Sequence, residues 1–149
     1  MNLGSPLLAG VAGEYFVAAE LSRRGHVASI TLRNTRGTDI VATNSEATRT
    51  ITIQCKTSST YKKQWMLNQK SESFYSDTHF YVFVSLRGEL ERPVYHIVPS
   101  KTVAEYVERS HKEWLKHKSK NGKPHKDSAI RNFSDKNDEY LERWELLGL

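Results

Sequence analysis

Cysteine and long apolar runs are nearly absent from this chain of 149 residues. Cys55 is the single cysteine, so no disulfide can form within the chain, and a reducing cytoplasm is the expected location. The longest clearly apolar run, residues 80–84, is far too short to cross a bilayer, and we recognise no charged leader with an apolar core. We therefore expect a soluble, cytoplasmic protein with no membrane partner. The Cys55 thiol is expected on the apolar face of a strand and not as a nucleophile.

Zinc-ligand patterns are also missing. His111, His117 and His125 lack the close paired spacing of a zinc site, and no cysteines accompany them. Residues 111–127 are more simply a solvated basic loop, although contact of His125 and Asp127 with phosphate or with another subunit is the alternative. A zinc role is therefore not expected.

Positive charge exceeds negative charge in this chain. Lys and Arg number 22 against 17 Asp and Glu, which gives a formal net charge of +5 and a pI near 9.3. This excess favours a polyanionic partner. Four basic residues near the motifs described below are the expected nucleic-acid contacts: Arg33, Arg36, Lys62 and Lys63. Contacts of this kind with phosphate would make binding strongly salt-dependent.

A carboxylate interrupts the apolar stripe of the first predicted helix. Residues 7–25 repeat apolar side chains at helical spacing, and at about 100° per residue Val17 and Leu21 share a stripe that has Glu14 in its middle. A carboxylate facing a sheet or core is disfavoured unless it is paired, hydrogen-bonded or bound to a metal. Glu20 is expected on the solvent side. Glu14 is therefore a candidate functional residue.

Two β-branched runs predict an antiparallel hairpin that carries three more polar residues. Residues 37–42 form a short strand with Asp39 near its beginning, and residues 50–57 follow after a short polar connection. Alternation along the second strand places Gln54 and Lys56 on one face, about 7 Å apart at roughly 3.3 Å per residue. Both side chains are expected to converge on Asp39.

Carboxylate, amide and ammonium groups in this arrangement fit a metal-dependent phosphodiesterase. Mg²⁺ prefers oxygen ligands and keeps several waters, so Asp39 would be the main ligand, helped by the Gln54 amide oxygen and the Cys55 carbonyl. Glu14 would bind the ion or a metal-bound water from the helix side. The Lys56 ammonium would orient or help deprotonate the attacking water, or neutralise charge growing on the phosphorane. Mn²⁺ is the alternative ion, because Gln54 contributes no charge.

These residues resemble the PD-(D/E)XK, or restriction-endonuclease-like, nuclease superfamily. Its signature is a helical Glu, an Asp opening one strand, and Glu/Gln-x-Lys on the next. The matching residues, within roughly the first 60, are Glu14, Gly37-Thr38-Asp39-Ile40 and Gln54-Cys55-Lys56. Their order and spacing are most similar to the Holliday-junction-resolvase-like members, and Gln in place of the usual Glu is similar to the Mrr-type enzymes.

The resemblance implies an α/β fold with a restriction-endonuclease-like core, in which a mixed central sheet of four to five strands is flanked by helices. It also implies a DNA endonuclease that works with Mg²⁺ or Mn²⁺, pairs as a homodimer, and uses Glu14, Asp39, Gln54 and Lys56 in catalysis. Three alternatives stay open. These are a non-catalytic nucleic-acid-binding or assembly module on the same fold, an RNase, and a structural role in which Glu14 forms a core ion pair.

The length fits a single domain, residues 1–149, with a motif-bearing core in residues 1–99 and a helical C-terminal extension in residues 100–149. Periodicity and turn residues predict the remaining elements. They are a loop and a short helix over 58–75, strands at 79–85 and 94–98, a helix from 100 to about 116, a basic loop at 118–127 and a short helix at 139–147.

Overall fold

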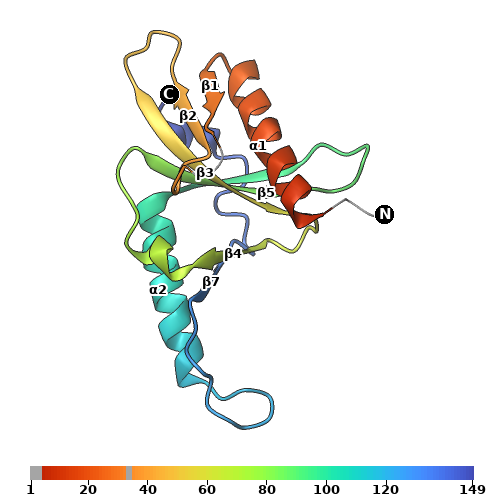
Figure 1. Cartoon of the computed structure of the whole chain (residues 1–149), viewed down its shortest axis with the longest axis vertical. Coiled ribbons are helices and arrows are strands. Elements are labelled where there is room, and N and C mark those ends of the chain that lie inside the picture. Colours follow the sequence, from red (N-terminus) through yellow and green to blue (C-terminus); the bar gives the residue numbers. More distant parts are fainter. Residues whose placement is uncertain (1–4, 33–34) are drawn as a thin grey trace.

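The computed structural model describes residues 5–32 and 35–149, and a mixed sheet lies at its centre (Figure 1). The strand order is β1-β2-β3-β5-β6; the β3–β5 pair is parallel and the other pairs are antiparallel. The strands are β1 (Val27–Ile30), β2 (Ile40–Thr43), β3 (Thr50–Ser58), β5 (His79–Ser85) and β6 (Val94–Pro99). The predicted α/β fold with a mixed sheet of four to five strands is confirmed, as is the hairpin of β2 and β3.

Helix α1 (Pro6–Arg23) covers one face of this sheet. Ser5 caps its first turn by accepting a hydrogen bond from the Leu8 N–H at 3.3 Å, and the fixed φ of Pro6 suits the first helical position. The helix packs its apolar stripe on alternate strand residues, which fixes the register of the sheet. This core contains Val17, Leu21, Ile40, Ala42, Ile51, Ile53, Phe80, Val82, Val84, Tyr95 and Ile97.

Helix α2 (Ser100–Lys116) packs on the opposite face. Along β5, Phe80 and Val82 face the α1 side while Tyr81 and Phe83 face the α2 side, so the whole strand is buried between two layers. The predicted strands at 79–85 and 94–98 and the predicted helix are confirmed. Within residues 5–32 and 35–149, neither helix is both long and apolar enough to span a bilayer.

A second, two-stranded antiparallel sheet adjoins the α2 side. Its strands are β4 (Gln64–Asn68) and β7 (Ile130–Ser134). In each strand every other residue is buried, and Trp65, Leu67 and Phe133 pack into the core beneath α2. Trp65 therefore has a structural role, and its indole N–H donates to the Val84 carbonyl at 3.1 Å.

Two predicted segments are only partly correct. In residues 58–75 the short helix is present as the 3₁₀ helix η1 (Gln69–Glu72), but part of the predicted loop is the strand β4. The C-terminal extension contains an unpredicted strand, β7, and the short helix expected at 139–147 is a 3₁₀ helix confined to η2 (Trp144–Leu147). Neither strand is apolar throughout, and each gains its hydrogen bonds from a partner far away in the sequence.

Glu20 also differs from its prediction. The residue is 6% exposed, and its carboxylate pairs with Arg24 at 2.6 Å and with Arg92 at 3.1 Å. Arg92 in turn binds Glu142 at 3.0 Å. The buried carboxylate thus joins α1 to the segment before β6 and to the C-terminal segment.

The far half of α2 and the loop after it extend away from the central sheet (Figure 1). We call residues 111–127 the basic arm. The Trp114 ring lies between two imidazoles, with centroids 5.5 Å from His111 and 4.0 Å from His125. His111 Nε2 lies 2.8 Å from Asp127 Oδ1. The predicted basic loop is present, and side-chain contacts hold it against α2.

Candidate active site

Asp39 is held at the point where β2 begins. Its N–H donates to the Ile53 carbonyl and its own carbonyl accepts from the Thr31 N–H, both at 2.9 Å. Its Oδ2 accepts a hydrogen bond from the Cys55 N–H at 2.7 Å. Oδ2 therefore takes the place of a backbone carbonyl as the next hydrogen-bond acceptor between β2 and β3. Oδ1 forms no hydrogen bond with a residue that the structure describes.

A glycine sets the approach to this position. Gly37 has φ +69°, and a Cβ at this residue would lie 2.7 Å from Cε1 of Phe74. A left-handed backbone conformation and a close ring contact together require glycine. The turn is thereby packed on Phe74, which orients Arg36 before it and Asp39 after it.

Cys55 contributes its backbone to the site and its thiol to the core. The N–H and C=O of a strand residue point to the same edge, so the Cys55 carbonyl lies on the edge that faces Asp39. Burial raises the pKa of the thiol well above its ordinary value, and the charges of Asp39 and Glu14 raise it further. The thiol therefore stays protonated. The expectation of a non-nucleophilic Cys55 on the apolar face agrees with its packing against the α1-side core.

Glu14 reaches the site from α1. It is half-buried, and with Asp39 it lines a hollow between the helix and the β1–β2 turn. The preceding residue explains the close approach of the helix, because a Cβ on Gly13 would lie 1.9 Å from Thr57 Oγ1. The absence of a side chain at Gly13 lets α1 lie directly on β3.

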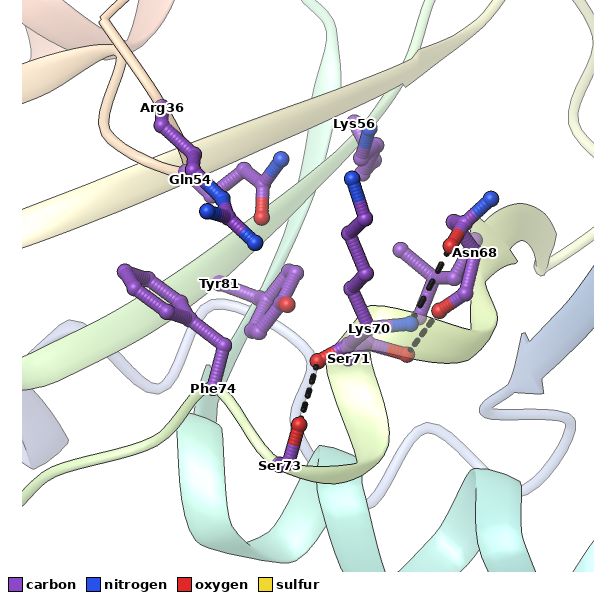
Figure 2. Close-up of a pocket in the computed structure, with 11 residues that line it drawn as sticks. Arg36, Gln54, Lys56, Asn68, Lys70, Ser71, Ser73, Phe74 and Tyr81 are labelled. Carbon is purple, nitrogen blue, oxygen red and sulfur yellow. Dashed lines mark hydrogen bonds between the residues drawn. The ribbon is translucent and has the colours of Figure 1, made fainter.

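Gln54 and Lys56 project from the opposite face of β3, as predicted, into a cavity of about 230 Å³ (Figure 2). Lys56 nevertheless acts on Asp39. Burial raises the pKa of the Asp39 carboxyl, whereas the Cys55 hydrogen bond and the Lys56 charge lower it without cancelling the rise. Glu14 and Asp39 thus line one hollow and Gln54 and Lys56 line another cavity, and the charge of Lys56 on Asp39 connects the two pairs. The expected convergence of all four side chains on one ion stays a prediction.

The donor set fits a hard divalent ion. The candidate ligands are carboxylate oxygens of Asp39 and Glu14, the Gln54 amide oxygen and the Cys55 carbonyl, which suit Mg²⁺ or Mn²⁺ better than zinc. No cluster of three or more His, Cys, Asp or Glu side chains with metal-binding geometry occurs in residues 5–32 and 35–149. Any ion here would therefore depend on amide and carbonyl oxygens as well as on carboxylates.

The predicted nucleic-acid contacts differ in their surroundings. Arg36 lines the cavity with Gln54 and Lys56, and Lys62 is exposed. Lys63 binds Asp138 at 2.6 Å, which neutralises much of its charge. Arg33 lies outside the described residues. Their contact with nucleic acid stays a prediction.

The cavity residues that were not predicted as site residues include Lys70 on η1 and Tyr81 on β5. Tyr81 is paired with Gln54 in the parallel register of β3 and β5, so its side chain shares the Gln54 face. Alternation would have placed Tyr81 here once that register was known. No sequence pattern indicates that Lys70 lies in the cavity, because its position depends on the unpredicted strand β4.

Neither the family models nor the curated proteins include a match to this sequence. Two solved nuclease structures do resemble the chain. Hjc, a Holliday junction resolvase from the archaeal hyperthermophile Archaeoglobus fulgidus, has a TM-score of 0.51 and 13% identity over 93% of this chain and 95% of its own. A bacterial homing endonuclease has a TM-score of 0.58 and 15% identity over 97% and 95%. Both are PD-(D/E)XK-like nucleases. The chain has the restriction-endonuclease-like fold.

The likeness is one of fold, and the predicted resemblance is confirmed at that level. In the restriction-endonuclease-like fold of this chain, α1 carries Glu14 and the β2–β3 hairpin carries Asp39, Gln54 and Lys56, of which the first two line the hollow and the last two line the cavity. A half-buried carboxylate, an amide and an ammonium could together position a phosphate and a water.

Proposed function

We propose that this protein is a divalent-metal-dependent DNA endonuclease. The observation that carries the proposal is the Asp39 carboxylate, which is bound to the Cys55 N–H, shares a hollow with Glu14 and feels the charge of Lys56. Perturbed carboxyl pKa values next to a cation are typical of functional sites. The nuclease folds of two structural neighbours support the same reaction class.

In this proposal each site residue has a defined role in metal binding or in charge stabilisation. Asp39 and Glu14 would supply negative charge for the ion, and the Gln54 amide and Cys55 carbonyl would complete the oxygen set. Mg²⁺ or Mn²⁺, when bound, supplies a lowered pKa for a water and neutralises phosphate charge. Lys56 would stabilise the negative charge that develops on the phosphate oxygens.

The test is cleavage of duplex, branched and single-stranded DNA, and of RNA, at one salt concentration with Mg²⁺ or Mn²⁺. Asp39→Ala and Lys56→Ala should each slow cleavage by roughly 100-fold or more, the loss typical for a charge-stabilising group. Circular dichroism and thermal melts should show that both variants remain folded. The exposed pair Asp77→Ala and Lys136→Ala are the matched controls and should cut like the parent chain.

Two results would contradict the proposal. DNA binding without cleavage in either metal would make the protein a binding module. Cleavage that survives both Asp39→Ala and Lys56→Ala would place the chemistry elsewhere.

A duplex has two strands, and one active site cuts one of them at a time. We therefore propose that two copies of the chain act together as a homodimer. Light scattering with and without DNA tests this, and concerted double-strand cleavage would accompany a dimer.

A further inference from the structure

Three positively charged side chains meet in the cavity in front of Gln54. Arg36 comes from the turn before β2, Lys56 from β3 and Lys70 from η1 (Figure 2). No ion pair joins any of the three to a carboxylate among residues 5–32 and 35–149, whereas Lys63 and Arg92 are paired with carboxylates. Like charges in a partly enclosed space repel one another, so an anion placed among them would be bound favourably.

Tyr81 adds an uncharged hydrogen-bond donor to the three cations. Its side chain is only 1% exposed and lines the cavity, and Figure 2 places its hydroxyl between Gln54 and Lys70. No hydrogen bond holds this hydroxyl among the described residues, so it can serve a ligand in the cavity. Burial and the Asp39 charge raise the pKa of Tyr81 to about 12, so the phenol is protonated and can donate.

The backbone holds Lys70 in place for this purpose. Asn68 Oδ1 accepts from the Lys70 N–H at 3.1 Å, and the Lys70 carbonyl accepts from the Phe74 N–H at 3.1 Å. The Ser71 hydroxyl closes the turn by donating to the Asn68 carbonyl at 2.7 Å. The ammonium of Lys70 is left to extend into the cavity toward Lys56 (Figure 2).

The size of the cavity limits the anion. Its volume of about 230 Å³ is below the roughly 300–1,000 Å³ that encloses a drug-sized ligand or cofactor. The space suits a phosphate with part of a sugar. Phosphate also matches the donors, which are two ammonium groups, a guanidinium and a phenol.

We propose that Arg36, Lys70 and Tyr81 form a second phosphate subsite, which holds a phosphate of the nucleic-acid strand beside the scissile one. Lys56, which lines the same cavity and whose charge acts on Asp39, would lie between the two phosphates. The identity of the strand rests on the proposed nuclease function, but binding of phosphate in the cavity does not require cleavage. The subsite would fix the register of the strand against Asp39.

Titration of the metal-free protein tests the subsite directly. The probes are inorganic phosphate, the thymidine dinucleotide TpT with an internal diester, and its 5′-phosphorylated form pTpT, followed by NMR or calorimetry. Saturable binding is expected. Lys70→Ala should weaken it about 10-fold or more, and Tyr81→Phe, which keeps the ring in the core, roughly 3- to 10-fold. Lys136→Ala is the control.

Comparison of the probes identifies the source of the phosphate. Binding of TpT and pTpT alike indicates an internal diester, while a strong preference for pTpT indicates a terminal phosphate, and either supports the subsite. Equal binding of every probe by the parent, Lys70→Ala and Tyr81→Phe proteins would overturn it.

In cleavage assays Tyr81→Phe should raise KM with little change in kcat, since the contact is made before and during reaction. A chain that binds phosphate through these residues but never cuts would retain the subsite and refute the nuclease.

Discussion

At the scale of single residues, the pKa of Asp39 is subject to opposing effects. Burial raises its pKa, while the Cys55 N–H and the Lys56 charge lower it less. A carboxyl group whose pKa is higher in the folded than in the unfolded chain favours folding when it is protonated. That stabilisation is present below the unfolded pKa and is lost as pH rises through the folded pKa. At neutral pH the ionised Asp39 therefore costs stability in the metal-free protein, and a bound cation would offset the cost.

This conflict predicts the behaviour of Asp39→Asn. The amide keeps an oxygen for the Cys55 N–H but removes the buried charge, so the metal-free variant should melt at the same or a higher temperature than the parent at pH 7.5. The difference should shrink in acid, where Asp39 is protonated. Mg²⁺ or Mn²⁺ should raise the melting temperature of the parent and not of the variant. Calorimetry at both pH values, with and without metal, measures all three effects.

Asp77→Asn serves as the control, because this aspartate is exposed. It should leave both the pH profile and the metal response unchanged. Equal stabilisation of the parent and Asp39→Asn by metal would mean that the ion binds elsewhere.

At the scale of elements, the site depends on how closely α1 lies on β3. Gly13 permits this approach, and Thr57 Oγ1, which is buried without a hydrogen-bond partner in the described chain, occupies the space beside it. Gly13→Ala gains about 1 kcal/mol of helix propensity. The new methyl group would meet Thr57 Oγ1 at 1.9 Å and Thr57 Cβ at 3.0 Å, so the helix has to move. Overpacking of this kind typically costs roughly 1–3 kcal/mol.

We therefore expect Gly13→Ala to lower the free energy of unfolding and to slow cleavage further than the reduced stability explains, because Glu14 moves with the helix. Urea denaturation and cleavage rates at a temperature where both proteins are folded measure the two effects. Gly10→Ala is the matched control on the same helix. A Cβ there meets nothing within 4 Å, so this variant should be stabilised by roughly 0.5–1 kcal/mol. A stabilised, fully active Gly13→Ala protein would refute the role of the close contact.

The elements that could be predicted are those with a local signal. The apolar stripe that contains Val17 and Leu21 identifies α1, and the alternation around Gln54 and Lys56 identifies β3 and its inward-facing polar pair. Strand β4 has the same alternation around Trp65 and Leu67, but it is short and bordered by polar residues. Its stability comes from β7, which no local pattern indicates. Lys70 follows β4 directly, so the cavity was only partly predictable.

The burial of charged side chains was likewise not predictable from the local sequence. Glu20 was expected in solvent, on the face of the helix opposite the apolar stripe. Its burial depends on Arg92, 72 residues further along the chain. A charged side chain is buried only when a partner compensates it, and the sequence does not name that partner.

At the scale of the whole molecule, positive charge gathers in two places, the cavity of the candidate site and the basic arm. The basic arm carries lysines 118, 120, 123 and 126 on a loop that Trp114, His125 and the His111–Asp127 contact hold against α2. None of these four lysines forms an ion pair within the described chain. An ordered loop with unpaired cations is suited to contact a polyanion beyond the point of cleavage.

Replacement of the four loop lysines by glutamine should therefore weaken DNA binding and make it less sensitive to salt. The slope of log K against log salt concentration should become shallower by roughly 0.9 for each phosphate of duplex DNA that the arm no longer neutralises. The rate of cleavage at saturating DNA should change little, because the arm does not line the hollow or the cavity of the candidate site. Anisotropy titrations over a series of KCl concentrations give the slope.

The matched control replaces Lys112 and Lys116, which are bound to Glu108 and Glu113 at 2.6 Å each and should affect the slope less. An unchanged slope in the four-lysine variant would leave the arm as a solvated loop and confine nucleic-acid binding to the region around Arg36 and Lys70.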